Sequence, residues 1–379
     1  MKLKTKRLFG GLVVAAMVWS LSGCGLPSGS DPDADRINIV QALSSDESND
    51  CYETADGAIP FEFPRDHGAH DRFKTEWWYY TGNLKTDTGR HFGYQLTFFR
   101  QGLACEVAPP GENTSEWQTR QLYFAHFAVT DTREKRFHSG MRMNRDSLGI
   151  SGALSDPFEV WIDDWQVTEK EGVLMMSARH ERVSVQLQLT REKPMILQGD
   201  NGFSRKGRDD FNASYYYSLP RLATRGDIRI EDITYPVTGL SWFDHEWSTS
   251  ALSADVVGWD WFSVHLDDGR DLMVCRVRNA EGAANGYGFG SVSRVDGSFV
   301  ILSEDEFQIR VTDHWKSPES GTTYPSSWEI LVPDHDISLN VVPVIPNQEH
   351  VRLFAYWEGA ARFEGDSVSG MGYVEMTGY

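Results

Sequence analysis

The chain has 379 residues and a formal net charge of −19, from 36 basic and 55 acidic side chains. This acidic surplus argues against a nucleic-acid-binding protein, because phosphate backbones require a basic surface, and against a protein that lies flat on an anionic bilayer. After the N-terminal segments described next, about 325 residues remain, which exceeds the usual size of one domain, so two domains are expected.

The first 24 residues have the layout of a lipoprotein export signal. Basic side chains within residues 2–7 precede an apolar stretch over residues 8–21, which is shorter than the roughly 20 residues that a membrane-spanning helix needs. Leu21-Ser22-Gly23-Cys24 then places small residues before a cysteine, the pattern that the lipoprotein signal peptidase recognises. We therefore expect residues 1–23 to be a signal peptide and Cys24 to be lipidated. The alternatives are an uncleaved anchor and a secretory signal followed by a chance cysteine.

The expected location follows from this signal. Gly25, rather than Asp, comes after the lipidated Cys24, so a signal for retention in the inner membrane is missing. We expect an exported protein, anchored through its acyl chains to the periplasmic face of the outer membrane. Residues 24–56 are rich in Ser, Asp, Gly and Asn and have no apolar period, as in a flexible tether.

Short strands recur along the rest of the chain. Apolar and polar residues alternate over residues 92–98, 183–189 and 262–266, and residues 122–129 are almost entirely apolar. Turn residues separate such runs at Asp87-Thr88-Gly89, Asp267-Asp268-Gly269, Asp296-Gly297 and Gly365-Asp366. A single helical turn is expected near residues 303–307. Many short strands joined by tight turns predict an all-β fold, either a sandwich or a barrel.

A weak internal repeat favours two related β domains. In each copy an aromatic pair opens a strand, a Gly-Arg turn follows, and an arginine closes the return strand. The two copies are Trp78-Tyr79 with Gly89-Arg90 and Arg100, and Trp261-Phe262 with Gly269-Arg270 and Arg278. We predict domains at residues 57–225 and 226–379, divided where Gly226 and alternating charges interrupt the apolar pattern. A chance similarity within an aromatic-rich β protein is the alternative.

The four cysteines have different expected roles. Cys24 is assigned to lipid, and Cys51 and Cys105 could form a disulfide in an exported protein or remain unpaired. Cys275 lies in an apolar strand and is expected to be a small buried side chain. The spacing of the cysteines matches no metal site, and neither a metal nor another cofactor is predicted.

Aromatic residues gather around a few acidic groups. The 13 tryptophans concentrate in residues 76–80, 242–247 and 258–262, and a triple tyrosine occupies residues 215–217. Neighbouring side chains of a strand point to opposite faces. Such runs therefore place rings on both faces of a sheet, and outward rings require cover from another layer or from a ligand.

Asp244-His245-Glu246 is the strongest chemical candidate. Tryptophans on either side would create a low dielectric, which raises the pKa of a carboxyl and suits it to donate a proton. On a strand, Asp244 and Glu246 share one face while His245 points to the other. Alternatively, these three residues form a buried polar network that holds the two domains together, and the two interpretations have equal weight. Glu76, beside two tryptophans, is likewise either a catalytic acid or a buried hydrogen-bond partner. His67 and His70 belong to an expected loop, for which metal binding is a weaker alternative.

Several longer motifs resemble one known family. The opening motif is Asp66-His67-Gly68 followed by Glu76-Trp77-Trp78-Tyr79-Tyr80-Thr81-Gly82-Asn83-Leu84. The other motifs lie at residues 198–200, 213–218, 242–247, 258–261, 356–359 and 372–375. Together they resemble the AttH-like, carotenoid 1,2-hydratase (hydroxyneurosporene synthase) family, and the resemblance covers about residues 57–379.

This resemblance implies a fold and a chemistry. The family is similar to lipocalins, so we expect two lipocalin-like β-barrel domains that pack together around an apolar cavity. Its characterised enzymes add water to an isolated carbon–carbon double bond, which requires a general acid and aromatic faces that stabilise a carbocation. By resemblance, Asp244 and His245 are the expected acid and proton partner, with Glu246 and Glu76 in reserve. The aromatic residues expected to bind the ligand are Trp77, Trp78, Tyr216, Trp242, Trp247, Trp259 and Trp261.

Two functions remain open at this point. The first is a carrier for an apolar, isoprenoid- or lipid-like ligand, in association with an ABC-type permease, as the resemblance to exported relatives suggests. The second is a hydratase or isomerase similar to the carotenoid 1,2-hydratases; a hydrolase is less favoured because no nucleophile motif stands out. A carrier needs a cavity without a perturbed carboxyl, whereas an enzyme needs Asp244 or Glu246 inside it.

Overall fold

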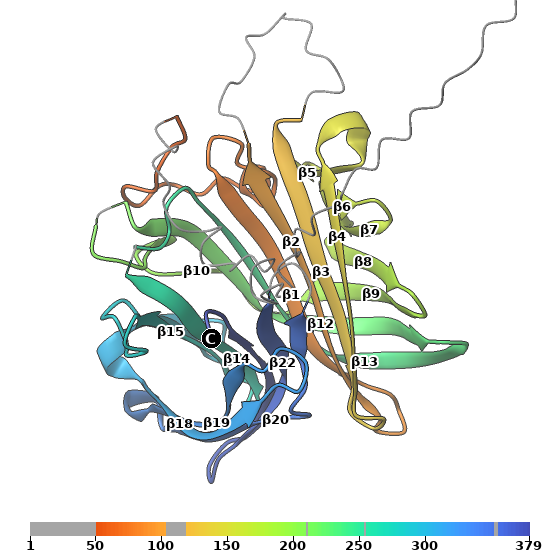
Figure 1. Ribbon diagram of the computed structural model, residues 1–379, viewed down its shortest axis with the longest axis vertical. Coiled ribbons are helices and arrows are strands. Elements are labelled where there is room, and N and C mark those ends of the chain that lie inside the picture. The colour runs from red at the N-terminus through yellow and green to blue at the C-terminus, as the bar shows by residue number, and fades with distance from the viewer. Residues whose placement is uncertain (1–50, 104–118, 210, 254, 352–354) are drawn as a thin grey trace, which may run out of the picture. The chain divides into compact units, whose positions relative to one another are not determined.

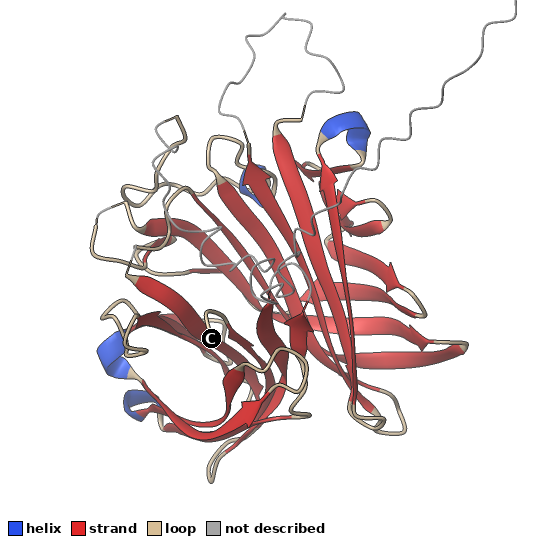
Figure 2. Ribbon diagram, in the orientation of Figure 1, coloured by secondary structure: helices blue, strands red, loops and turns tan. Residues whose placement is uncertain are grey.

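The computed structural model describes residues 51–103, 119–209, 211–253, 255–351 and 355–379. These residues belong to one compact unit. Regular structure in them is almost entirely antiparallel strand, and helix is limited to single 3-10 turns (Figure 2). The predicted all-β class is therefore confirmed. No helix within these described ranges is long and apolar enough to cross a membrane.

The first sheet has 13 strands and curves into a nearly closed barrel (Figure 1). The strands are β1 (Thr75–Lys85), β2 (His91–Gly102), β3 (Gln121–Asp131), β4 (Arg136–Arg145), β5 (Ser151–Ser155), β6 (Phe158–Ile162), β7 (Trp165–Lys170), β8 (Val173–His180), β9 (Val183–Arg191), β10 (Ile196–Leu197), β11 (Phe203–Arg205), β12 (Ala213–Ile230) and β13 (Ile233–Ser248). Their order is β4-β3-β2-β1-β13-β12-β9-β8-β7-β6-β5, with β10 and β11 also paired to β12. The single-turn helices η2 and η3 are Arg65–His67 and Ser147–Gly149.

The second sheet has 10 strands and forms a half-barrel (Figure 1). The strands are β14 (Val256–Leu266), β15 (Asp271–Asn279), β16 (Phe289–Ser293), β17 (Phe299–Ser303), β18 (Gln308–Lys316), β19 (Thr323–Val332), β20 (Ile337–Pro343), β21 (Glu349–Val351), β22 (Ala355–Glu364) and β23 (Gly370–Met376). Their order is β17-β16-β15-β14-β23-β22-β20-β19-β18, with β21 paired to β22. The helical turns are η4 (Glu304–Glu306), where one was predicted, and η5 (Pro333–His335).

The turn residues and the repeat correspond to hairpins of these sheets. The β1–β2 hairpin lies at the centre of the first sheet and the matching β14–β15 hairpin lies in the second. The predicted division between residues 225 and 226 falls inside β12, whose pairing with β13 extends to Trp247. The sheets change between Ser248 and Val256. The charged residues 224–232 instead form the projecting end of the β12–β13 hairpin, where alternate side chains are exposed to solvent.

Both faces of the central strands are buried, so the described residues form three cores. One core fills the first barrel, one fills the half-barrel, and the third lies between the two sheets. Because successive side chains alternate, Trp78 points into the barrel and Tyr79 into the core between the sheets. Side-chain hydrogen bonds also join the sheets, such as those from Asn83 to the Gly372 carbonyl (2.9 Å) and between His126 and Tyr356 (2.7 Å). Two barrel-like units that pack together are thus confirmed.

Two of the four cysteines, Cys51 and Cys275, lie within the described residues. Cys51 takes part in a disulfide, whereas Cys105, the partner proposed from the sequence, lies outside the described residues. Cys24, the signal peptide and most of the tether lie outside them as well. Cys275 is a free, buried thiol on β15, as expected, and burial raises its pKa.

Candidate functional site

A cavity lies in the core between the two sheets. Strands β1, β2, β12 and β13 line one side, and strands β14, β15, β16, β22 and β23 line the other. Its aromatic walls include Trp77, Tyr79, Phe99, Trp259, Trp261 and Phe289. The volume of this cavity is about 70 Å³, which is enough for a few waters or for a slim part of a ligand.

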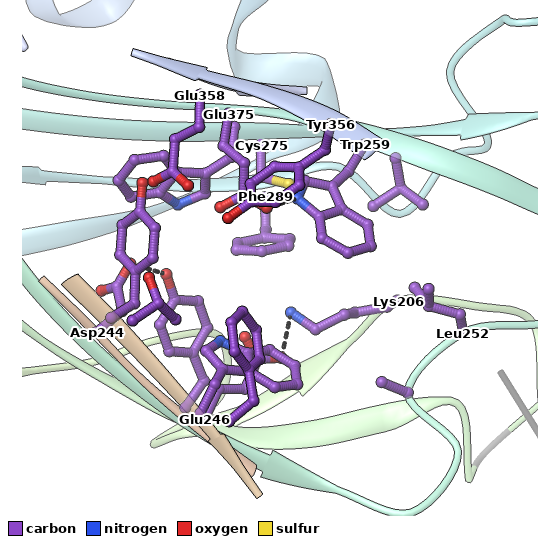
Figure 3. A pocket seen from close by; sticks show the side chains of 18 residues that line it. Lys206, Asp244, Glu246, Leu252, Trp259, Cys275, Phe289, Tyr356, Glu358 and Glu375 are labelled. Atoms are coloured by element: carbon purple, nitrogen blue, oxygen red, sulfur yellow. Dashed lines mark hydrogen bonds and ion pairs between the residues drawn. The ribbon is translucent and has the colours of Figure 1, made fainter. Parts of the chain in front are cut away.

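Asp244 and Glu246 point into this cavity from β13, as Figure 3 shows. His245, between them, points into the first barrel instead, where it packs on Trp78. Strand β13 is paired without a bulge at this point, so the alternation of side chains is regular. The division of the three residues between two faces, predicted from the sequence, is confirmed. The structure therefore does not bring together Asp244 and His245 as acid and proton partner.

Asp244 is fully buried and accepts three hydrogen bonds. Its donors are Ser218 (2.5 Å), the Trp242 indole (2.7 Å) and the Tyr216 hydroxyl (2.8 Å). Burial raises the pKa of Asp244 to about 7, although these three donors favour the charged carboxylate and act in the opposite direction. Asp244 can therefore exchange a proton near neutral pH.

Two further carboxyls face the cavity from the second sheet. Glu358 on β22 and Glu375 on β23 are direct cross-strand neighbours, and both are lined up opposite Asp244 and Glu246 (Figure 3). Burial raises the pKa of Glu375 to about 8, although its carboxylate accepts a 2.9 Å hydrogen bond from the Trp259 indole. Burial and the neighbouring Glu375 raise the pKa of Glu358 well above its ordinary value.

Glu358 differs from the other acids of the cavity in its surroundings. Both of its oxygens are buried and form no hydrogen bond of ordinary geometry with the described residues; the hydroxyls of Tyr79 and Tyr356 lie close enough to lower its pKa, but burial outweighs them. An unpaired buried carboxylate is costly, so the neutral, protonated acid is the favoured form. The cavity thus holds a carboxylic acid next to aromatic faces, which is the arrangement that proton donation to an apolar group requires.

Sequence reasoning did not identify Glu358 and Glu375 as site residues. Each lies in a motif that carried the family resemblance, but neither has another acidic residue beside it in the sequence. The pairing of β22 with β23 alone makes them neighbours. A signal was nevertheless present, since an acidic residue in an otherwise apolar and aromatic strand is rarely buried without a role.

Glu246 has a cationic partner within the cavity. Lys206, in the loop after β11, lies 2.7 Å from its carboxylate, and both side chains are almost fully buried. The Lys206 ammonium also lies 4.3 Å from the centre of the Phe289 ring. Glu246 thus forms a buried ion pair with Lys206.

Glu76 and His245 belong to a polar network inside the first barrel. One oxygen of Glu76 contacts His245 (2.8 Å) and His70 (2.7 Å), and the other accepts a 2.7 Å hydrogen bond from Arg100. Burial alone would raise the pKa of Glu76, but Arg100 and His70 outweigh it and hold the pKa well below its ordinary value. Glu76 is therefore charged and structural, and it does not reach the cavity between the sheets.

The same three residues have donor atoms close enough to hold a metal. The donor atoms of His70, Glu76 and His245 all lie within 4.8 Å of one another. The hydrogen bonds among them already use these atoms, and the Arg100 guanidinium is in contact with the carboxylate. A bound cation would have to compete with Arg100, so a hydrogen-bonded network explains the cluster.

The predicted aromatic residues divide between the two faces. Trp77, Tyr216, Trp259 and Trp261 line the cavity between the sheets. Trp242 belongs to the same core but does not line the cavity; its indole donates a hydrogen bond to Asp244, which does. Trp78 and Trp247 point into the first barrel instead. They cannot contact a ligand held between the sheets.

The fold and the cavity define a class of protein: a lipocalin-like protein of two β units with a buried, aromatic and acidic cavity between them. The sequence profile of the AttH-like family matches residues 54–379, and the chain belongs to this family. A comparison with proteins of curated function gives no match.

Two solved structures are similar to this one. A protein from Nitrosomonas europaea assigned to AttH is 32% identical, with a TM-score of 0.77 over 86% of this chain and 99% of that chain. Kievitone hydratase from Nectria haematococca is 13% identical, with a TM-score of 0.62 over 88% of this chain and 96% of that chain. The second likeness is one of fold.

Proposed function

We propose that the cavity between the sheets binds an apolar, isoprenoid- or lipid-like alkene and protonates it, so that the chain acts as a hydratase or isomerase. The observation that carries this proposal is the group of three buried carboxyls with raised pKa: Asp244, Glu358 and Glu375. A carrier for an apolar ligand gains nothing from such groups, since burying them costs free energy. A proton donor for an alkene requires one of them in its neutral form.

The geometry supports a division of roles between the two sheets. Glu358, whose oxygens form no hydrogen bond of ordinary geometry with the described residues, is the donor that transfers its proton to one alkene carbon. The other carbon becomes cationic and is stabilised by the faces of rings such as Tyr79 and Trp261. Asp244, which is held by three donors that favour its charged form, accepts a proton from the attacking water. The product gains one water, and the proton returns from Asp244 to Glu358 through solvent.

An isomerase would use the same groups in a shorter sequence. After protonation by Glu358, Asp244 would remove a proton from a carbon next to the cation, and the double bond would reform at a new place. Kievitone hydratase is a hydratase by name and shares this fold. At 13% identity that likeness concerns the fold, so the proposal depends on the cavity itself.

The decisive experiment begins with the ligand that the protein retains. Native mass spectrometry of the purified protein identifies an alkene ligand, which is then incubated with wild-type protein in heavy-oxygen water and, separately, in deuterated water. A hydratase adds one labelled water, and an isomerase adds deuterium without a water. We expect Asp244→Asn to retain the ligand and to lose the conversion. A retained ligand that wild-type protein leaves unlabelled in both solvents would show a carrier.

We also propose that this activity takes place at a membrane surface, with the protein exported and lipid-anchored at Cys24. The support is the sequence of the export signal and its small residues before the cysteine. Cys24→Ser is expected to move the protein from the membrane fraction to the soluble fraction of its host, as immunoblotting would show. An unchanged distribution would contradict the lipid anchor. Association with an ABC-type permease stays a prediction.

A further inference from the structure

The first barrel contains a second cavity, separate from the cavity between the sheets. Its volume is about 490 Å³, within the range of about 300–1,000 Å³ that is typical of ligand sites. The wall between the two cavities is formed by strands such as β1 and β13. Tyr80 and Phe243 of these strands face the barrel cavity, whereas their neighbours Tyr79 and Asp244 face the other.

The walls of the barrel cavity are mainly apolar. The residues that line them include Phe63, Phe158, Leu174, Leu189, Leu219 and Phe243. Most of these side chains belong to the core of the first barrel. An apolar chain is the ligand that such walls favour, because its burial removes hydrocarbon from water on both sides of the contact.

The polar groups deep in this cavity are neutral. The Tyr80 hydroxyl is fully buried and has no hydrogen-bond partner among the described residues. The His67 ring contacts the Tyr217 hydroxyl at 2.7 Å, and that hydroxyl also lies 3.2 Å from His245. Burial lowers the pKa of His67 to about 4, with His245 and Arg191 acting in the same direction. His67 is therefore uncharged at neutral pH and offers no counter-ion to a ligand.

Arg191 is the cation that lines the cavity. It lies at the end of β9, two residues after the inward-facing Leu189, and its side chain is exposed at the rim. It forms no ion pair within the part of the chain that the structure describes. Its charge lowers the pKa of both His67 and Tyr217, so the guanidinium lies close to the cavity.

Glu169 is the acidic residue that lines the same cavity. It is on β7 and is separated from Arg191 by strand β8: Glu169 is paired with Leu174, and Leu174 is paired with Leu189 of β9. The two opposite charges thus lie at different points of the rim and do not neutralise each other by contact. An anionic group held at Arg191 would be repelled weakly by Glu169.

We propose that the interior of the first barrel is a second ligand site, which takes a single acyl chain whose terminal carboxylate pairs with Arg191. The chain lies against the apolar walls, and the carboxylate stays at the rim, where it remains partly hydrated. A charge-assisted pair with a guanidinium then fixes the direction of the ligand. The site differs in position and in charge from the acidic cavity between the sheets.

Binding of dodecanoate and of the neutral 1-dodecanol to the purified full chain tests this proposal. Tryptophan fluorescence should show saturable binding of dodecanoate to wild-type protein. Arg191→Gln should weaken dodecanoate binding about tenfold, the effect of losing one charge-assisted hydrogen bond, and should leave 1-dodecanol binding unchanged. Glu169→Gln should keep or strengthen dodecanoate binding. Equal affinity of wild type and Arg191→Gln for dodecanoate would overturn the role of Arg191.

Two further variants place the ligand in the barrel. Leu174 is half-buried in the cavity wall, so Leu174→Trp should fill the cavity and abolish dodecanoate binding. Leu154→Trp, at an exposed position of β5, is the matched control and should bind normally. Circular dichroism checks that both variants fold. Asp244→Asn should leave dodecanoate binding intact; loss of binding in this variant would place the ligand between the sheets and overturn the proposal.

Discussion

Replacing Arg100 by methionine is expected to lower the free energy of unfolding by about 3–5 kcal/mol, the cost of leaving a buried charge without its partner. The side chains of Arg100 and Glu76 are both fully buried and lie 2.7 Å apart. Arg100 also donates hydrogen bonds to the carbonyl groups of His70 (2.7 Å) and Phe73 (2.8 Å), and the variant removes both of these donors. Urea unfolding at neutral pH measures the loss.

The chain offers a matched control for this variant. Arg72 forms an ion pair with Glu53, but 74% and 42% of these side chains are exposed to solvent. Arg72→Met should therefore cost less than about 1 kcal/mol. The double variant Arg100→Met/Glu76→Gln should recover part of the loss, since it removes the orphaned charge. Equal effects of Arg100→Met and Arg72→Met would contradict the structural role of the buried pair.

The strands and turns could be predicted because their signals are local. A two-residue period of apolar side chains identified β2, β9 and β14, and the turns at residues 87–89 and 267–269 located the hairpins that contain β2 and β14. The same period correctly placed Asp244 and Glu246 on one face of β13 and His245 on the other. The same local signals did not locate the change from one sheet to the other: the predicted division at residue 225 falls inside β12. A charged stretch is also what an exposed hairpin end contains, and β12 runs through it.

Only part of the candidate site could be predicted from the sequence, and the reason is physical. Alternation shows that Trp77 and Trp78 face opposite ways, but it cannot show which face borders a cavity. That depends on the second sheet, whose strands begin more than 170 residues later. Glu358 and Glu375 depend on the same long-range packing, together with the pairing of β22 and β23. Contacts between distant segments therefore decide where the chemistry lies.

The two faces of the central strands give the chain two chemically different interiors. One set of side chains of β1 and β13, among them Glu76 and His245, forms a charged network with Arg100 of β2 inside the first barrel. The alternate set forms the wall of a cavity whose acids are held neutral by burial. Charged Glu76 and neutral Glu358 thus show opposite responses to burial, because only Glu76 has a cation in contact with it.

Replacing Glu358 by glutamine is expected to reduce the proposed conversion by about 10²–10⁴-fold, the range that a general acid contributes. The amide has nearly the same shape but cannot supply the proton that the alkene must receive. Glu304→Gln is a control outside the cavity, and it should retain full activity. Initial rates with the ligand identified by native mass spectrometry measure both effects. Full activity of Glu358→Gln would contradict its role as the donor.

The rate should also fall at high pH, because the donor must be protonated. Glu358 and Glu375 are adjacent and titrate as a pair, and burial raises the pKa of Glu375 to about 8. Burial and Glu375 raise the pKa of Glu358, the donor, well above its ordinary value, so the rate should fall about tenfold per pH unit once the pH is high enough to ionise Glu358. A rate that increases steadily up to pH 10 would require a deprotonated group instead of a neutral acid as the essential one.

The raised pKa of Glu375 also makes the stability of the fold depend on pH, and stability falls as pH rises. The ordinary pKa of Glu375 is 4.5, and its pKa in the folded chain is about 8. Between these values the folded chain holds a proton that the unfolded chain has lost, so each such group lowers stability by about 1.4 kcal/mol per pH unit as pH rises. The stability contributed by this group is complete below about pH 4.5 and is lost as pH rises through about 8. Urea unfolding between pH 6.5 and 8 should show that the free energy of unfolding decreases with pH in wild type and decreases less in Glu375→Gln. If the free energy of unfolding decreased equally with pH in both proteins, Glu375 would already be ionised in the fold.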